Sequence, residues 1–496
     1  MWDTLYENQS FIFLYRGLVY PWKQIIYYDF DKTMDQNLLF SIIRRCEENS
    51  AKVRGIVCDM GNSKLLKQLQ VYSEQKHFFM NPADDERKVF IFLDTPHCFK
   101  NLRNHCLDSN LCVTKTNGNV IILTKNHFLE LMSKDQNDFK HCPKLSLLHL
   151  ECKGNERQRV KYAVQLFSDT VAKAFKFLFG KKYLELNEII STIDAWFDVC
   201  NSRIKFHWKK MKCALGVHES EQIKSLKNML DLVKRMTFGK DKKSQRKKPF
   251  QTGIIVSINS TLDLYQELKN EGISYLLTSR LNQDGLENFF SQVRALGGNN
   301  SHPSTVETIN RIRTLCLTKN VKSIVNNSVV EMQDDDEFLS VNLIDELDLD
   351  LPDNVHCKSQ KNEIPELNVE ARDYVAGYIT HKLKLSASND RKPNSWISLK
   401  GEGRLKEPNE KLKEIVAICD NIFDQVLGRG LSDLKNPLEK LKTEILNQNP
   451  DFPPQIVTLF CKVKFYSRIK VLNVNLKLSR MKNSVRSLKQ MGQFLN

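Results

Sequence analysis

The first hundred residues alternate between short apolar runs and amphipathic stretches. Four apolar runs predict strands, the first two at hairpin spacing around the turn-forming Tyr20-Pro21-Trp22. These runs are residues 10–18, 23–30, 53–58 and 89–93. Apolar residues at helical spacing predict helices over residues 35–48, 62–70 and 96–106. The order β-β-α-β-α-β-α predicts an α/β domain.

The pattern changes after residue 107. Residues 108–235 are rich in lysine and mostly show helical periodicity, which predicts a separate helical domain. The run GKDKKSQRKKP at 239–249 is so densely charged that it predicts an exposed linker or a nuclear-import signal. Helical patterns return at 281–296, 370–385 and 409–426, and the acidic stretch 331–353 predicts a linker.

Composition narrows the class of protein. The chain of 496 residues carries a formal net charge of +15, which suits a polyanionic partner such as nucleic acid, although many basic proteins bind none. Its 13 cysteines are scattered and form no CxxC pair, which favours reduced thiols over a disulfide framework. No apolar run approaches the roughly 20 residues of a membrane span, and the first ten residues resemble no secretory signal. We therefore expect an intracellular protein that is not in a membrane.

Carboxylates at strand ends and on one helix are the candidate catalytic groups. Asp59 in VCDMGNS and Asp94 in FLDTPH each follow a predicted buried strand, where an aspartate can be a metal ligand or simply a cap or turn residue. Glu287 lies in SRLNQDGLENFFSQVR, on the polar face of an amphipathic helix. That face is either part of a metal site, in which hard Mg²⁺ takes carboxylate oxygens, or a solvated surface.

Eight segments together carry a family resemblance. They are WKQIIYYDF, VCDMGNS, FLDTPHCFKNLRN, VKYAVQLFSDTVA, WFDVCNSR, TSRLNQDGLENFFSQVR, DYVAGYITHKL and GRLKEPNEKL. They occur in this order in P-element transposases and their THAP-containing relatives, which the chain resembles over nearly its whole length. The resemblance implies an α/β RNase H-like domain interrupted by an all-α GTP-binding insertion and followed by a mainly α-helical C-terminal region.

The resemblance also implies a DDE-type acidic triad that cuts and joins DNA. Asp59 matches the second catalytic aspartate and Glu287 the final glutamate, so both are implied ligands of Mg²⁺. The family's first aspartate lies on a strand ahead of the hairpin, and the chain is expected to lack that strand, since Asp3 stands too close to the hairpin and outside any apolar run. The protein is therefore expected to be an incomplete, N-terminally truncated copy, or an active GTP-dependent transposase whose first exon was missed.

GTP is the second implied cofactor. Five positions are carried over from the family as nucleotide-binding residues: Lys161, Lys176, Asp198, Asn201 and Asp284. Asp194, Asp198 and Asn201 follow one another at i, i+4 and i+7, which places them on one helical stripe. A carboxylate can accept from the guanine N1 and N2 donors, and lysine can neutralise phosphates. Alternatively, Asp198 and Asn201 cap the helix end. No Walker A motif is present, so only the resemblance indicates GTP.

The residue patterns and the resemblance together predict the domain boundaries of the chain, its partners and its location in the cell. The predicted segments are an RNase H-like N-terminal part (1–107), the insertion (108–235), a basic linker and return segment (236–275), an RNase H-like C-terminal part with the catalytic helix (276–310), an acidic linker (311–365) and a helical C-terminal domain (366–496). No counterpart of the THAP zinc finger is recognised, so DNA binding is expected to be non-specific, through basic surfaces, in the nucleus. A homo-oligomer and a domesticated protein-interaction factor remain open alternatives.

Overall fold

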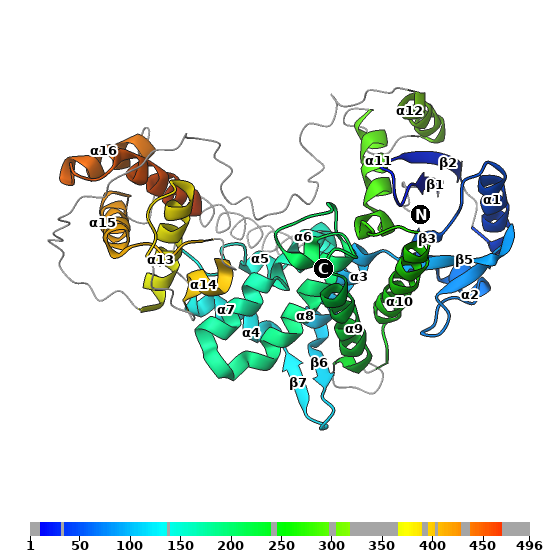
Figure 1. The fold of residues 1–496 in the computed structure, drawn as a ribbon, viewed down its shortest axis with the longest axis horizontal. Coiled ribbons are helices and arrows are strands. Elements are labelled where there is room, and N and C mark those ends of the chain that lie inside the picture. The colour runs from blue at the N-terminus through cyan, green and yellow to red at the C-terminus, as the bar shows by residue number, and fades with distance from the viewer. Residues whose placement is uncertain are drawn as a thin grey trace, which may run out of the picture. The chain divides into compact units, whose positions relative to one another are not determined.

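The computed structural model describes residues 10–30, 34–135, 139–239, 246–296, 304–317, 366–388, 395–401, 405–427 and 437–468. As far as these residues show, the chain divides into two compact units (Figure 1). The first unit combines Met1–Thr124, Lys153–Phe167 and Glu188–Gln333, and the second combines Lys125–Cys152, Ser168–Asn187 and Asp334–Asn496. Asp3, the glycine-asparagine loop 297–300, the acidic stretch 331–353 and most of the basic run lie outside the described residues.

A three-stranded sheet forms the centre of the first unit. Its order is β3 (Gly55–Cys58), β5 (Asp84–Leu93), β4 (Phe78–Asn81), with β3 parallel and β4 antiparallel to β5. The second half of β5 is a continuous apolar run whose side chains are at most 2% exposed, as expected of a strand covered on both faces. The predicted strands at 53–58 and 89–93 are confirmed, whereas β4 was not predicted.

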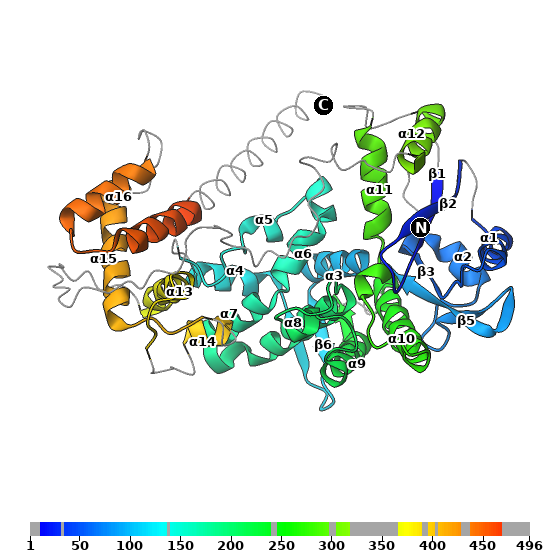
Figure 2. The ribbon, with the colours of Figure 1, turned by 45° about the horizontal axis from the view of Figure 1, so that its top comes forward.

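Helices surround this sheet. α1 (Gln36–Glu48), η1 (Met60–Asn62), α2 (Ser63–Gln68) and α3 (Thr95–Ser109) follow the predicted order. α10 (Pro249–Asn270) runs alongside β5 (Figure 2). Its Ser257 hydroxyl accepts from the Leu93 amide at 2.8 Å, and its Ser260 hydroxyl donates to the Ile91 carbonyl at 2.6 Å. The prediction of a linker and return segment at 236–275 therefore needs correction, because most of that segment is a buried helix.

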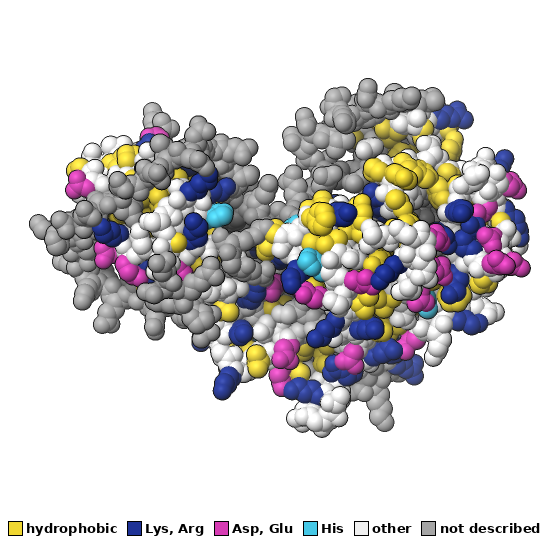
Figure 3. Space-filling view, viewed as in Figure 1, with side chains coloured by type: hydrophobic (Ala, Val, Ile, Leu, Met, Phe, Trp, Pro, Cys, Tyr) yellow, Lys and Arg dark blue, Asp and Glu magenta, His cyan; other side chains and the backbone are white. Residues whose placement is uncertain are grey.

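The hairpin at the start of the described chain forms its own two-stranded sheet. β1 (Ser10–Arg16) pairs antiparallel with β2 (Lys23–Phe30), as predicted, and no sheet pairing joins either strand to β3 within the described residues. The hairpin packs with α11 (Asp284–Ala295) and α12 (Thr305–Leu317) in one apolar cluster. Hydrophobic side chains also gather on the surface over the region of α11 and the hairpin (Figure 3).

The predicted all-α insertion is wrong in one respect, because the segment also contains β-structure. β6 (Leu111–Thr114) pairs antiparallel with both β7 (Val120–Leu123) and β8 (Met236–Phe238), giving the order β7-β6-β8. β6 and β7 are short β-branched runs around Asn117-Gly118, and Gly118 has φ +84°. The helices of this region in the first unit are α6 (Val160–Leu166), most of α8 (Leu184–Cys200) and α9 (Glu219–Arg235).

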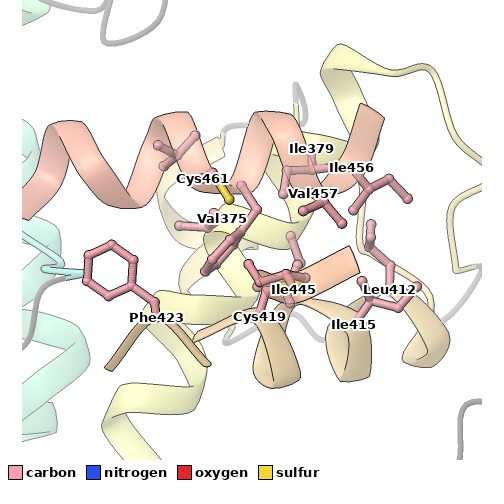
Figure 4. Packing of buried hydrophobic residues seen from close by; sticks show 14 of the residues in the cluster. Val375, Ile379, Leu412, Ile415, Cys419, Phe423, Ile445, Ile456, Val457 and Cys461 are labelled. Carbon is pink, nitrogen blue, oxygen red and sulfur yellow. The ribbon is translucent and has the colours of Figure 1, made fainter. Parts of the chain in front are cut away.

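The described part of the second unit consists of helices and loops, with one isolated β-bridge between Ala387 and Pro408. Its elements are α4 (Lys125–Lys134), α5 (Leu147–Leu150), α7 (Asp169–Phe179), α13 (Glu366–Lys382), α14 (Trp396–Gly401), α15 (Glu410–Leu427), α16 (Pro437–Gln448) and helical residues 454–468. α13, α15, α16 and residues 454–468 enclose one apolar cluster, in which Ile415, Cys419 and Val457 are fully or almost fully buried (Figure 4). Among the described helices of the chain, none combines the length and apolar character that crossing a bilayer requires.

Candidate functional site

The carboxyl ends of β3 and β5 place two aspartates at the same sheet edge. Cys58 and Leu93 are register partners in the parallel pair, and the next residues are Asp59 and Asp94. The Asp94 amide donates to the Cys58 carbonyl at 3.0 Å, so the two chain segments leave the sheet side by side. The edge beyond the carboxyl ends of parallel strands is where α/β folds commonly bind ligands.

Asp94 is buried and connects two helices. One carboxylate oxygen accepts from the His97 amide at 2.9 Å and caps α3, and the other accepts from the Gln283 amide at 2.8 Å, directly before α11. The side chain is 1% exposed. Burial raises the pKa of Asp94 to about 6, against the opposing effect of His97 and the two amide donors. Asp94 thus fixes the start of α11 against the end of β5.

Glu287 projects from the first turn of α11 toward α3. Its carboxylate lies 3.5 Å from Nε2 of His97. The hydrogen bond from His97 holds the pKa of Glu287 below its usual range, although burial opposes this. Burial also disfavours charge on His97, but the hydrogen bond to Glu287 and the charges of Asp94 and Glu287 outweigh it and raise the pKa of His97. The buried Leu286, Phe289, Phe290 and Val293 confirm the predicted apolar face of this helix.

Asp59 makes its hydrogen bonds within its own loop. One carboxylate oxygen accepts from the Gly61 amide at 2.9 Å and from Nδ2 of Asn62 at 2.8 Å, so Asp59 caps η1. The described residues contain no group of three or more acidic, histidine or cysteine side chains arranged to hold a metal. Asp59 and Glu287 are the two carboxylates that the family resemblance assigns to Mg²⁺, which prefers oxygen ligands.

A second polar cluster lies where the end of α8 meets the start of α11. Nδ2 of Asn282 lies 3.2 Å from Oδ1 of Asn201 and 3.1 Å from Oδ2 of Asp284. Arg203 donates to the same Asp284 oxygen at 2.6 Å. Burial raises the pKa of Asp284, and the Arg203 guanidinium opposes that shift. We call Asn201, Arg203, Asn282 and Asp284 the α8–α11 junction.

Buried hydroxyls hold the two segments of the junction together. The Ser202 amide donates to the Thr278 hydroxyl at 3.0 Å, and the Thr278 amide donates to the Ser202 hydroxyl at 3.1 Å. The Ser279 amide adds a bond to the Ser202 carbonyl at 3.1 Å. Satisfied polar networks of this kind fix geometry inside a protein. The junction is therefore preformed rather than assembled from mobile loops.

The predicted nucleotide residues are brought together only in part. Asn201 and Asp284 meet through Asn282, and Asp198 lies 9% exposed in the last turn of α8. Lys161 lies exposed on α6 of the same unit. Lys176 lies on α7 of the second unit, so the structure does not place it with the other four.

Several residues of the site were not predicted. Asp94 was noticed only as a residue after a strand, and Arg203 and Asn282 were not singled out. For Asp94, the Asp-Thr-Pro sequence at a predicted helix start was a usable signal of an N-cap. Its bond to Gln283, 189 positions away, had no signal in the local pattern.

Comparisons with known proteins agree on one family. Residues 96–214 match the family model "TNP-like, GTP-binding insertion domain", and residues 279–307 match "TNP-like, RNase H C-terminal domain". The chain is 30% identical to the Drosophila melanogaster "Transposable element P transposase" over 97% of its own length and 66% of that protein. It is 24% identical to the human "DNA transposase THAP9" over 47% of its own length and 26% of that protein.

A solved structure extends the comparison from sequence to fold. The "Drosophila P element transposase strand transfer complex" matches with a TM-score of 0.58 and 33% identity, covering 63% of this chain and 70% of that one. The chain thus spans just under two thirds of the fly transposase and about a quarter of the human protein. The match extends well beyond a single motif.

Proposed function

The chain belongs to the P element transposase family, and we propose that it is a transposase-derived protein that binds GTP at the α8–α11 junction and binds DNA through basic surfaces. One observation supports the nucleotide site. Asn201 and Asp284 are 83 positions apart, and both accept from the same side-chain amide of Asn282. Both positions had been carried over from the family motifs, and the fold brings them into one cluster.

The junction has the chemistry that a guanine nucleotide requires. A carboxylate such as Asp284 can accept from N1–H and N2–H of guanine together, and an amide such as Asn201 can bond the remaining edge of the base. The Asp284 side chain is 26% exposed, so a base can reach it by replacing part of its bond with Arg203. Lys161, exposed on α6, is the proposed phosphate partner in the same unit.

DNA binding rests on charge and family. A net charge of +15 provides sequence-independent affinity for phosphates, and the strand transfer complex is the assembly in which the related fly protein was solved. DNA as the partner and the basic run near residue 240 support a nuclear protein. Its DNA affinity is proposed to fall steeply as salt rises.

Catalytic incompleteness is part of the proposal. It is supported by the hydrogen bonds of Asp59 within its own loop and by the pairing of Glu287 with His97. The test is a nicking assay with supercoiled DNA, Mg²⁺ and GTP. We expect no product, and nicking that disappears in Glu287→Gln would contradict this part of the proposal.

Nucleotide titration tests the site directly. Binding of a fluorescent GTP analogue should weaken by about tenfold or more in Asp284→Ala, because a charge-assisted hydrogen bond contributes on the order of 1.5–3 kcal/mol. Asp198→Ala should also bind more weakly. The matched control is Asp231→Ala, since Asp231 is an exposed carboxylate on α9 paired with Arg235. Equal affinity of Asp284→Ala and the unaltered chain would reject the site.

Base specificity sharpens the same test. Replacing a base-reading carboxylate by an amide disfavours guanine and allows a donor to face the extra carbonyl of xanthine. If Asp284 reads the base, Asp284→Asn should lose affinity for GTP and gain affinity for xanthosine triphosphate. Loss of both nucleotides would assign Asp284 to the shape of the site rather than to base recognition.

A further inference from the structure

The segment between α8 and α9 combines basic and aromatic residues. Residues 203–212 read RIKFHWKKMK, with five basic and no acidic side chains, at Arg203, Lys205, Lys209, Lys210 and Lys212. Phe206, in its middle, is 69% exposed, and Ile204 is 50% exposed. Residues 203–206 are consecutive exposed positions at the surface of the first unit. This combination is typical of surfaces that contact single-stranded nucleic acid.

The segment is rigid despite its exposure. The Cys213 thiol donates to the His207 carbonyl at 3.1 Å, and the Ala214 amide donates to the Ile204 carbonyl at 3.1 Å. Gln222 is fully buried. Its side-chain amide donates to the Cys213 carbonyl at 2.9 Å and accepts from the Gly216 amide at 3.0 Å. An exposed aromatic ring held this way loses little conformational freedom when it binds a ligand.

The segment is also connected to the helix that carries Glu287. Leu215 and Leu276 exchange both backbone hydrogen bonds at 2.9 Å, which joins this segment to the chain leading into α11. Arg203, at its start, bonds Asp284. A nucleic acid on residues 203–206 would therefore lie next to the α8–α11 junction.

Charge is placed to assist stacking on Phe206. The Lys205 ammonium lies 5.2 Å from the Phe206 ring centre and 4.6 Å from the Tyr275 ring centre. Arg203 and Lys210 are paired with Asp284 and Glu221. Among the described residues, the Lys205 ammonium lies against these two rings, and from this position it can contact a phosphate beside a base stacked on Phe206.

We propose that residues 203–206 form a platform for unpaired DNA nucleotides, with Phe206 stacking on a base and Lys205 contacting the adjacent phosphate. The inference rests on the proposed DNA-binding function and specifies which surface takes unpaired strands. A single-stranded overhang on a duplex would present such nucleotides. A folded protein partner is disfavoured, because residues 203–212 carry five lysine or arginine side chains and no acidic one.

The test compares two labelled DNA probes on the full chain by fluorescence anisotropy. One is an oligothymidylate of about 12 nucleotides, within the range of single-strand site sizes, and the other is a blunt duplex of the same length. Phe206→Ala should weaken oligothymidylate binding by about tenfold, since one stacked base is worth on the order of 1–3 kcal/mol. Duplex binding should change less than twofold, because paired bases present no free face.

Two further variants separate stacking from charge. Phe206→Leu keeps apolar bulk but removes the aromatic face, so it should resemble Phe206→Ala. Lys205→Ala should reduce the slope of log affinity against log salt by about 0.7 for the single strand, as expected for one lost phosphate contact. Phe206→Leu should leave that slope unchanged.

The matched control is Tyr466→Ala. Tyr466 is 60% exposed, and its basic neighbours Lys464 and Arg468 are paired with Asp420 and Asp424. It should bind both probes like the unaltered chain. Equal single-strand affinity of Phe206→Ala and the unaltered chain, or an equal loss for both probes, would overturn the platform. If the unaltered chain binds neither probe, the DNA part of the proposed function fails; if it binds both and the variants do not differ, only this inference fails.

Discussion

The helical core of the second unit and the α8–α11 junction of the first unit differ in the kinds of side chain that they bury. In the second unit, side chains from α13, α15, α16 and residues 454–468 fill one space with apolar atoms, as Ile415, Phe423 and Ile445 illustrate at 0% exposure (Figure 4). In the first unit, the corresponding buried volume near α11 contains Asp94, Asn282 and Gln283, all at most 6% exposed. The second-unit cluster is apolar, whereas near the start of α11 the first unit also buries hydrogen-bonding groups beside the apolar face of that helix.

The difference indicates where stability and function reside. Burying hydrocarbon stabilises a fold directly, whereas burying a polar group costs free energy unless each donor and acceptor is satisfied. Asp94, Ser202 and Thr278 meet that requirement with specific partners, whereas the buried Nε2 of Gln283 has no hydrogen-bond partner among the described residues. A polar interior that is costly yet well bonded is typical of a binding site. The two regions should therefore respond differently to substitution.

Phe423→Ala should be the most destabilising change. Phe423 is fully buried in the second unit, and removing its ring leaves a cavity that costs about 3–5 kcal/mol. Denaturant unfolding of the full chain measures this loss. Because the junction lies in the first unit, GTP affinity of the folded variant should be unchanged. A loss of GTP affinity equal to that of Asp284→Ala would break the distinction between the two regions.

Asp94→Ala should destabilise the first unit by about 2 kcal/mol. The substitution leaves the buried amides of His97 and Gln283 without their acceptor, and each unsatisfied donor is costly. Unlike Phe423→Ala, it should also weaken GTP binding, because Asp94 fixes the residue next to Asp284. Thermal unfolding with and without GTP measures both effects. Unchanged nucleotide binding in a destabilised Asp94→Ala would limit the residue to a role in folding.

The pH dependence of stability should identify the same carboxyl group. Burial raises the pKa of Asp94 from 3.8 to about 6, so the folded state favours the protonated form. The resulting stabilisation is complete below pH 3.8 and is lost as pH rises through about 6. Relative to Asp94→Asn, the unaltered chain should therefore lose on the order of 2 kcal/mol between about pH 4 and pH 7. Parallel stability profiles for the two proteins would contradict the assignment.

His97→Gln should have the smallest effect. The Glu287 side chain is 49% exposed, so solvent screening limits the ion pair to about 1 kcal/mol or less. Because the pKa of His97 is raised, its pairing contributes stability that is fully present below pH 6.5 and is lost as pH rises. Because the pKa of Glu287 is lowered, its pairing contributes stability that is fully present above pH 4.5 and is lost as pH falls. The variant should differ most from the unaltered chain between these values. A difference that persists at pH 9 would indicate packing rather than charge.

The sequence predicted those elements whose periodicity is strong. The hairpin, β3 and β5 were located from their apolar runs and α11 from its helical period, and Glu287 was correctly placed on the polar face of α11. α10 was missed because its apolar residues, including Ile254, Ile255 and Val256, are consecutive and buried on several faces, which removes the one-sided pattern.

Other features depend on contacts that local patterns do not contain. The β6–β7 hairpin carried a readable Asn117-Gly118 turn signal, but the lysine-rich helical surroundings dominated the prediction. Asn282 had no local signal at all, because its importance comes from lying between Asn201 and Asp284. Site residues carried over from the family were thus located on their elements, while the residues that connect them emerged only from the fold.

Hydrogen–deuterium exchange with and without GTP tests the nucleotide site most directly. We expect slower exchange on GTP addition in residues 198–203 and 278–287, which form and flank the junction, and no change in residues 410–427 of the second-unit core. Asp284→Ala should abolish the protection at the same GTP concentration. Unchanged exchange in both junction segments, under conditions where GTP binding is demonstrated independently, would show that the nucleotide binds elsewhere than at the α8–α11 junction.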